Sequence, residues 1–138
     1  MSKIAQVGTE IRDAACLITV LKKQFKEVES HSTSQPLVGY DREDKKSAQI
    51  IVRKKDLGQH SFSDLGFARN TKGNYDCLIA DFAYHRHFNQ KWLDTVARDC
   101  SVEKSMRIMN ERECELTGPA ETLANGDVRM TFRVPVTA

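Results

Sequence analysis

Hydrophobic and polar residues alternate most regularly near the end of the chain. Over residues 128–134 every second side chain is apolar, and those between are arginine or threonine. A period of two puts the apolar side chains on one face of an extended chain, so this segment is predicted to be a half-buried β-strand. A weaker alternation around Cys114 and Leu116 predicts another strand shortly before it.

The beginning of the chain carries two overlapping patterns. Apolar residues recur there at spacings of three and four, as in one long amphipathic helix, but the first of them also alternate with polar residues, as in a strand. Gly8 would cost a helix interior up to about 1 kcal/mol, and Asp13 is a favourable N-cap for a helix that starts right after it. We therefore expect a strand over residues 4–11 and a helix over residues 14–26.

The middle of the chain is predicted to hold four strands. Residues 27–36 are polar and without periodicity, which indicates a loop, and residues 54–61 indicate another. A charged turn over residues 41–46 joins the first strand pair, and the Gly- and Asn-containing turn over residues 70–74 joins the second. The predicted strands are 37–40, 48–53, 65–69 and 75–82.

Two helices are predicted after these strands. Phe88, Trp92 and Val96 recur every four residues, so residues 88–99 are expected to be helical, and Ser101 can cap a second, short helix. The resulting order is strand, helix, four strands, two helices and two strands. It predicts a single α+β domain over residues 1–138, with a mainly antiparallel sheet and helices packed on one face.

Composition agrees with one globular domain. The chain has 138 residues, of which 40% are hydrophobic and 29% charged, a balance ordinary for a folded protein. The start of the chain lacks a signal sequence and no apolar run approaches the ~18 residues of a membrane span, so we expect a cytoplasmic protein with no membrane partner. The four cysteines are widely spaced and are expected to be reduced packing residues.

The sequence lacks the motifs of standard catalytic and cofactor sites. Neither glycine-rich phosphate-binding pattern occurs, and there is no G-x-S-x-G or H-E-x-x-H motif. We therefore expect no cofactor, and lean toward a protein that is not an enzyme.

One cluster has residue types that could bind a transition metal. Its members are Cys77, Asp81, His85 and His87, a thiol, a carboxylate and two imidazoles. Residues two apart share a face of a strand, so Cys77 and Asp81 could point the same way. Surface or capping histidines where a strand passes into a helix explain the same residues more simply, and a metal-dependent enzyme is the weakest hypothesis.

A second cluster is basic. Its members are Arg42, Lys45, Lys46, Arg53, Lys54 and Lys55. Such a ribbon could follow a nucleic-acid backbone, but four acidic residues are interleaved with it and the net charge of the chain is only +2. A solvated, charge-mixed strand edge that discourages aggregation explains the same residues, and we favour it over nucleic-acid binding.

The segment from Asp64 to Tyr75, with Asp81 after it, reads D-L-G-F-A-R-N-T-K-G-N-Y…D. It resembles the signature of a small family of unknown function that plastids carry as hypothetical chloroplast reading frame thirty-five, with relatives in cyanobacteria, other bacteria and some phages. Residues 7–13 and 38–40 match the same family. Residues 99–102 and the extended tail depart from its pattern, which indicates a divergent member.

The resemblance implies an accessory subunit or adaptor, because genes of this family often lie near an AAA-type ATPase. Together with the missing catalytic motifs, it makes a non-catalytic protein-interaction module the leading hypothesis, with nucleic-acid binding as the alternative. The oligomeric state stays open. The surface expected to contact a protein partner consists of Asn70, Lys72, Gly73, Asn74, Tyr84, His85 and His87.

Overall fold

The structure is a computed structural model that describes residues 3–112 and 115–133. Its centre is a five-stranded sheet in the order β1-β5-β4-β3-β2, in which all neighbours are antiparallel. The strands are β1 (Ile4–Gly8), β2 (Glu29–Pro36), β3 (Ser47–Val52), β4 (Leu65–Arg69) and β5 (Tyr75–Ala80). The helices are α1 (Ala14–Lys22), α2 (Asp81–Arg86) and α3 (Gln90–Glu111). The predicted class, α+β with a mainly antiparallel sheet, is confirmed.

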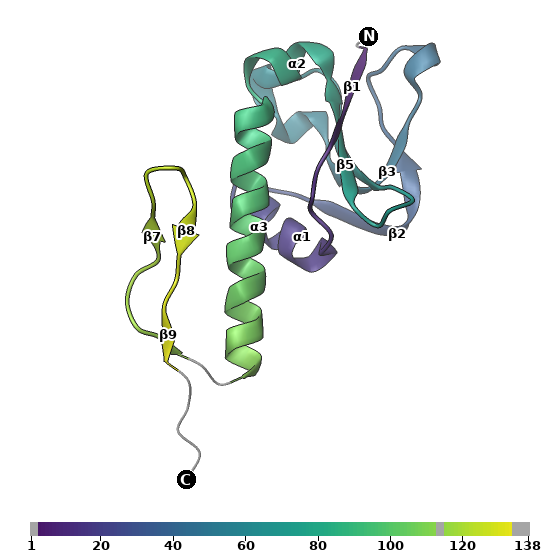
Figure 1. Cartoon of the computed structure of the whole chain (residues 1–138). Coiled ribbons are helices and arrows are strands. Elements are labelled where there is room, and N and C mark those ends of the chain that lie inside the picture. The colour runs from purple at the N-terminus through teal and green to yellow at the C-terminus, as the bar shows by residue number, and fades with distance from the viewer. Residues whose placement is uncertain (1–2, 113–114, 134–138) are drawn as a thin grey trace.

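Helices α1 and α3 pack against each other on one side of the sheet (Figure 1). The Asp13 carboxylate accepts a hydrogen bond from the Cys16 amide at 3.0 Å and so caps α1, as the sequence predicts. On the sheet, Phe67 lies in register between Ile50 and Cys77, and all three side chains are buried. These residues and the apolar faces of the two helices form the core.

The segment that links β2 to β3 packs on the sheet and reaches its other edge, where the Asp44 carboxylate accepts a hydrogen bond from the Ile4 amide of β1 at 3.0 Å. Leu37 packs directly over Gly66 of β4, where an added Cβ would come within 2.9 Å of the Leu37 Cδ2 atom. The strand predicted over residues 37–40 is wrong, because only the Leu37 amide continues the pairing beside β3, to the Lys46 carbonyl oxygen, and the segment then leaves β3, bonds to Asp64 and crosses toward β1. Only Tyr40 takes part in an isolated bridge, and Gly39 turns the chain with a φ of 98°.

Further predictions need correction. The strand predicted over residues 75–82 ends at Ala80, and the next two residues begin α2. Residues 27–36 were expected to be a loop, but β2 runs from Glu29 to Pro36. Its side chains are polar on both faces, so main-chain pairing with β3 forms the strand without any hydrophobic pattern. The two predicted helices are one helix, α3, in which the Ser101 hydroxyl donates to the Ala97 carbonyl oxygen and starts no new helix.

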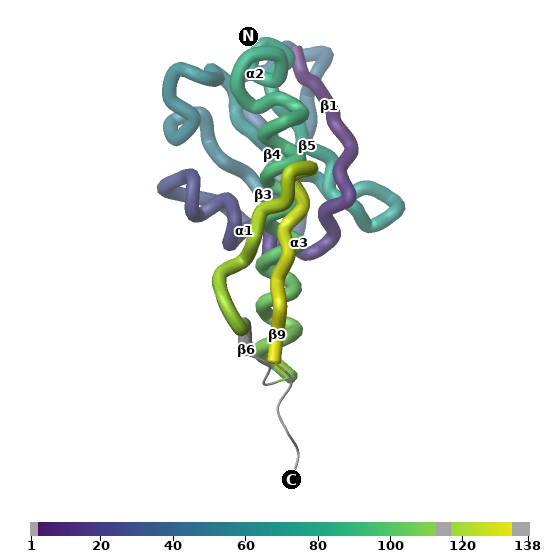
Figure 2. The backbone as a smooth tube through the Cα atoms, turned by 60° about the vertical axis from the view of Figure 1, so that its left-hand side comes forward, coloured from purple at the N-terminus to yellow at the C-terminus, as the bar shows by residue number. Residues whose placement is uncertain are grey.

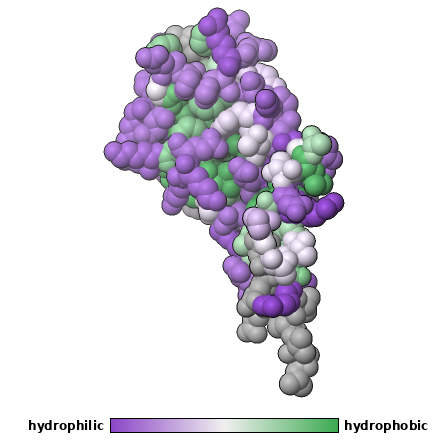
Figure 3. Space-filling view, turned by 90° about the vertical axis from the view of Figure 1, so that its left-hand side faces the viewer, coloured by the Kyte–Doolittle hydropathy of each residue, from purple (hydrophilic) through white to green (hydrophobic). Residues whose placement is uncertain are grey.

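The tail after α3 forms a long, thin hairpin that lies beside that helix (Figure 1). It consists of β6 (Glu115–Leu116) paired with β9 (Phe132–Arg133), and β7 (Glu121–Thr122) paired with β8 (Val128–Arg129). The single strand predicted over residues 128–134 is thus two short strands, and Val134 and Cys114 lie outside the described residues. Figure 3 shows that this hairpin stands out from the body of the molecule and carries hydrophobic surface.

Candidate functional site

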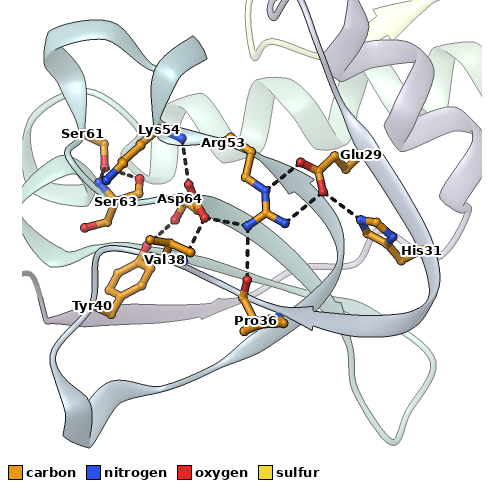
Figure 4. Close-up of polar contacts among 10 residues, drawn as sticks. All are labelled: Glu29, His31, Pro36, Val38, Tyr40, Arg53, Lys54, Ser61, Ser63 and Asp64. Carbon is orange, nitrogen blue, oxygen red and sulfur yellow. Dashed lines mark hydrogen bonds and ion pairs between the residues drawn. The ribbon is translucent and has the colours of Figure 1, made fainter.

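The aspartate that opens the signature segment is the centre of a buried polar network (Figure 4). The Asp64 side chain, only 2% exposed, accepts hydrogen bonds from the backbone amides of Val38 at 2.9 Å and Lys54 at 2.8 Å. It also forms an ion pair with the Arg53 guanidinium at 2.9 Å. One carboxylate thus holds the segment that crosses the sheet and the end of β3 against the start of β4.

The residues around Asp64 extend this network. The Ser63 hydroxyl donates to the Gly39 carbonyl oxygen at 2.7 Å, and the Tyr40 hydroxyl donates to the Asp64 carbonyl oxygen at 2.5 Å. Ser61 donates from its side chain to the Ser63 carbonyl oxygen at 2.8 Å. Burial raises the pKa of the Tyr40 hydroxyl, so this group stays a neutral donor. The segments 38–40 and 64–66 are therefore in direct contact through hydrogen bonds.

This network presents two exposed hydrophobic side chains. Phe62 is 76% exposed although its neighbours Ser61 and Ser63 are buried, and Val38, next to Gly39, is 52% exposed. An added Cβ on Gly39 would come within 2.8 Å of the Phe62 carbonyl oxygen, so the two segments are in contact. Aromatic side chains are enriched at protein–protein interfaces, so Phe62 is a candidate contact residue. A lone phenylalanine between serines gives no signal in the sequence, and the sequence prediction missed it.

Arg53 joins this network to the edge of the sheet. Its guanidinium forms a two-point ion pair with Glu29 of β2, with distances of 2.7 and 3.0 Å. His31 lies 2.8 Å from the same carboxylate. The hydrogen bonds from Arg53 and His31 lower the pKa of Glu29 to about 2, and those to Glu29 and Asp64 raise the pKa of Arg53.

The basic residues do not form one continuous ribbon. Arg42, Lys45 and Lys46 precede β3 and the other three follow it, so the strand separates the two groups. Within the second group Arg53 is bound to two carboxylates and Lys55 forms an ion pair with Glu27 at 2.8 Å. Lys54 is exposed, and its backbone amide binds Asp64. Nucleic-acid binding by this segment stays a prediction, but its cations are partly neutralised.

The expected protein-contact surface falls into two places at opposite ends of β5. One place is the β4–β5 turn, which is stabilised by its own hydrogen bonds. The Asn70 side chain accepts hydrogen bonds from the amides of Lys72 and Asn74, and Gly73 has a φ of 86°. The others lie on and just after α2, roughly 20 Å away at about 3.3 Å per strand residue (Figure 1). The two groups therefore lie at separate places on the surface, and their role in binding a partner stays a prediction.

The α2 region brings two histidine side chains together. The His87 ring stacks on that of His60, with centroids 3.5 Å apart and planes 6° from parallel. Burial and the neighbouring His60 lower the pKa of His87. Tyr84 lies on α2, and its hydroxyl donates a hydrogen bond to the Gln90 side chain at 3.2 Å.

The weak metal candidates are not brought together. Cys77 faces the core, where burial raises the pKa of its thiol, while the exposed Asp81 carboxylate and His85 ring lie 3.3 Å apart on α2. Within residues 3–112 and 115–133, no three or more His, Cys, Asp or Glu side chains are arranged to hold a metal ion. Cys16, Cys77 and Cys100 are buried free thiols, and none of the helices in the described part of the chain is both long and apolar enough to cross a bilayer.

Comparison with known proteins gives one finding. No curated protein and no solved structure matches the chain. A family model described as a protein of unknown function, DUF1257, matches residues 21–131, which covers most of the sheet, α2, α3 and most of the hairpin. The chain belongs to this family, DUF1257.

Proposed function

We propose that this protein is a non-catalytic interaction module that binds a protein partner through the surface formed by Val38 and Phe62. The observation that carries the proposal is the Ser61–Asp64 loop, in which buried polar residues on both sides hold an aromatic side chain that is 76% exposed. A preorganised aromatic side chain loses little conformational freedom when a partner covers it, which is why such residues dominate many interfaces.

The partner class that we propose is a larger assembly, such as an AAA-type ATPase, for which this protein would act as an accessory subunit. The resemblance of its signature to the plastid family of reading frame thirty-five supports this choice, and we propose the same relationship for the chain. We further propose that it acts in the cytoplasm.

The experiment is retention of host proteins on the tagged full-length chain, with half of each sample treated with nuclease. We expect one protein to be retained in both halves and Phe62→Ser to reduce its retention at least tenfold, about 1.4 kcal/mol or more. Phe82→Ser is the matched control, because Phe82 is also exposed, at 54%, but lies on α2 beside Arg86.

Two results would contradict the proposal. Equal retention by the wild type, Phe62→Ser and Val38→Ser would remove this surface. Retention that disappears with nuclease would instead favour nucleic-acid binding, and the next variant to test would be Lys45→Ala with Lys46→Ala.

A further inference from the structure

The outer edge of β1 has unpaired main-chain groups. The Asp81 amide donates to the Lys3 carbonyl oxygen, so the odd-numbered residues of this segment face β5 in the antiparallel ladder. The amides and carbonyls of Ile4, Gln6 and Gly8 therefore point away from the sheet. The Asp44 carboxylate accepts from the Ile4 amide at 3.0 Å, which leaves the edge at Gln6 and Gly8 open.

This edge has few of the features that usually prevent pairing with another strand. Its five residues pair with β5 in continuous register, without a bulge, and none of them is charged or a proline. In Figure 2 β1 is the outermost strand of the sheet on the right-hand side. An extended peptide could therefore add to the sheet here by main-chain hydrogen bonds.

A groove continues from the end of this edge along α3. A cavity of about 350 Å³ lies between the segment from Gly8 to Glu10 and the first turns of α3, where Leu93 and Ala97 line it. A second cavity, of about 620 Å³, shares Glu10 and Ala97 with the first and reaches Met130 of the hairpin. Figure 2 shows the hairpin lying in front of α3.

The length of this groove fits a short extended segment. Its α3 wall runs from Gln90 to Ser105, which is about 22 Å at ~1.5 Å per helical residue. An extended chain rises about 3.3 Å per residue, so roughly seven residues would span it.

Charge defines the chemistry of the occupant at the β1 end. The residues lining the smaller cavity include two carboxylates, Glu10 and Asp94, and no Lys, Arg or His. The Asp94 side chain accepts a hydrogen bond from Gln90 at 2.9 Å, which fixes it at this position. A Lys or Arg side chain of a bound peptide would be attracted to this pair.

We infer that the free edge of β1 and the groove beside α3 bind an extended segment of a partner protein, as an added sheet strand that carries a basic residue facing Glu10 and Asp94. This inference rests on the proposed protein-binding function and names a second surface, apart from Phe62.

The test uses a library of random nine-residue peptides displayed on phage and selected on the immobilised full-length chain. We expect the selected peptides to contain Lys or Arg and to bind Gln6→Ala as tightly as the wild type. Gln6→Pro should weaken binding at least about tenfold, because it removes an outward amide and leaves the pairing with β5 intact. Asp94→Asn should weaken it about threefold, and Asp99→Asn, on the same helix but outside the lining of both cavities, should not.

Deuterium exchange adds a readout at single residues. Bound peptide should slow exchange at the Gln6 and Gly8 amides and leave Phe62 unchanged. Failure to select any peptide, or equal binding to Gln6→Pro and Gln6→Ala, would overturn the inference. The proposed function is tested separately, since loss of host partner retention by Phe62→Ser does not depend on peptide binding at β1.

Discussion

The two outer strands of the sheet have opposite characters. β2 pairs with β3 only at its two ends, at Glu29 and Ser30 and again at Gln35 and Pro36, with a shift of register between them. β1 pairs with β5 at every residue and continues in the same register from Ile4 to Gly8. β2 is thus an irregular edge that ends in a proline, and β1 is a regular edge without one.

The two edge strands also differ in the side-chain contacts that hold them. The β2 side is held by the Glu29–Arg53–Asp64 network, which also fixes the segment that crosses the sheet. The unpaired side of β1 is bound only at Ile4, by the Asp44 carboxylate, among the hydrogen bonds of the described residues. Irregular strands with charged residues and proline are the usual protection of a sheet edge against pairing with other chains. The comparison contrasts an irregular edge, which we call the closed edge, with a regular one, which is the edge that we propose for a partner.

The largest expected effect is a loss of stability when the network beside β2 is broken. Asp64→Ala removes the acceptor of two backbone amides and one guanidinium, so we expect a loss of about 3–5 kcal/mol in the free energy of unfolding. Urea unfolding followed by circular dichroism measures it. Asp41→Ala, in the same crossing segment, should cost less than about 0.5 kcal/mol. Equal losses in the two variants would show that the network does not hold this side.

The next effect compares a glycine of the sheet interior with one of the open edge. Gly66→Ala puts a Cβ within 2.8 Å of the Ala48 Cβ and 2.9 Å of the Leu37 Cδ2, so β3 or the segment that links β2 to β3 must move, and we expect a cost of about 1–3 kcal/mol. Gly8→Ala meets only the Asp76 carboxylate, at 3.8 Å, and should change stability by less than about 0.5 kcal/mol. Thermal unfolding measures the stability of both variants. If Gly8→Ala were as unstable as Gly66→Ala, β1 would be more tightly enclosed than we infer.

The sequence predicts the parts of the fold that leave a local signal, either an alternation of hydrophobic residues or characteristic turn residues. The β4–β5 hairpin is found from its turn residues, because Asn70 and Gly73 have side-chain and backbone roles that are visible locally. β2 was missed because long-range pairing and the Glu29–Arg53 ion pair form it, and neither leaves a periodic signal. The exposure of Phe62 was missed for the same reason, since it depends on contacts between segments far apart in the chain.

A smaller effect should appear when the closed edge is titrated with acid. Glu29 has a pKa of about 2 in the folded protein against an ordinary value of 4.5, so its ion pair stabilises the fold above pH 4.5 and loses that contribution as the pH falls toward 2. Glu29→Gln should lower the free energy of unfolding at pH 7 by less than about 1 kcal/mol, because the pair is partly exposed. The difference between wild type and variant should shrink between pH 4.5 and 2, and a difference independent of pH would assign it to packing.

The smallest effect concerns the single bond on the outer side of β1. Asp44→Ala removes the acceptor of the Ile4 amide, which water can replace at this edge, so we expect a loss of about 0.5–1 kcal/mol or less. Exchange of the Ile4 amide should become faster, while the Gln6 and Gly8 amides, which have no such acceptor, should exchange quickly in both proteins. The Ala5 and Val7 amides face β5 and should stay protected in both, which provides an internal control. If the Gln6 and Gly8 amides were protected from exchange in the protein without a partner, the β1 edge would already be paired. The difference between the two edges would then indicate assembly of several copies of this chain instead of a site for another protein.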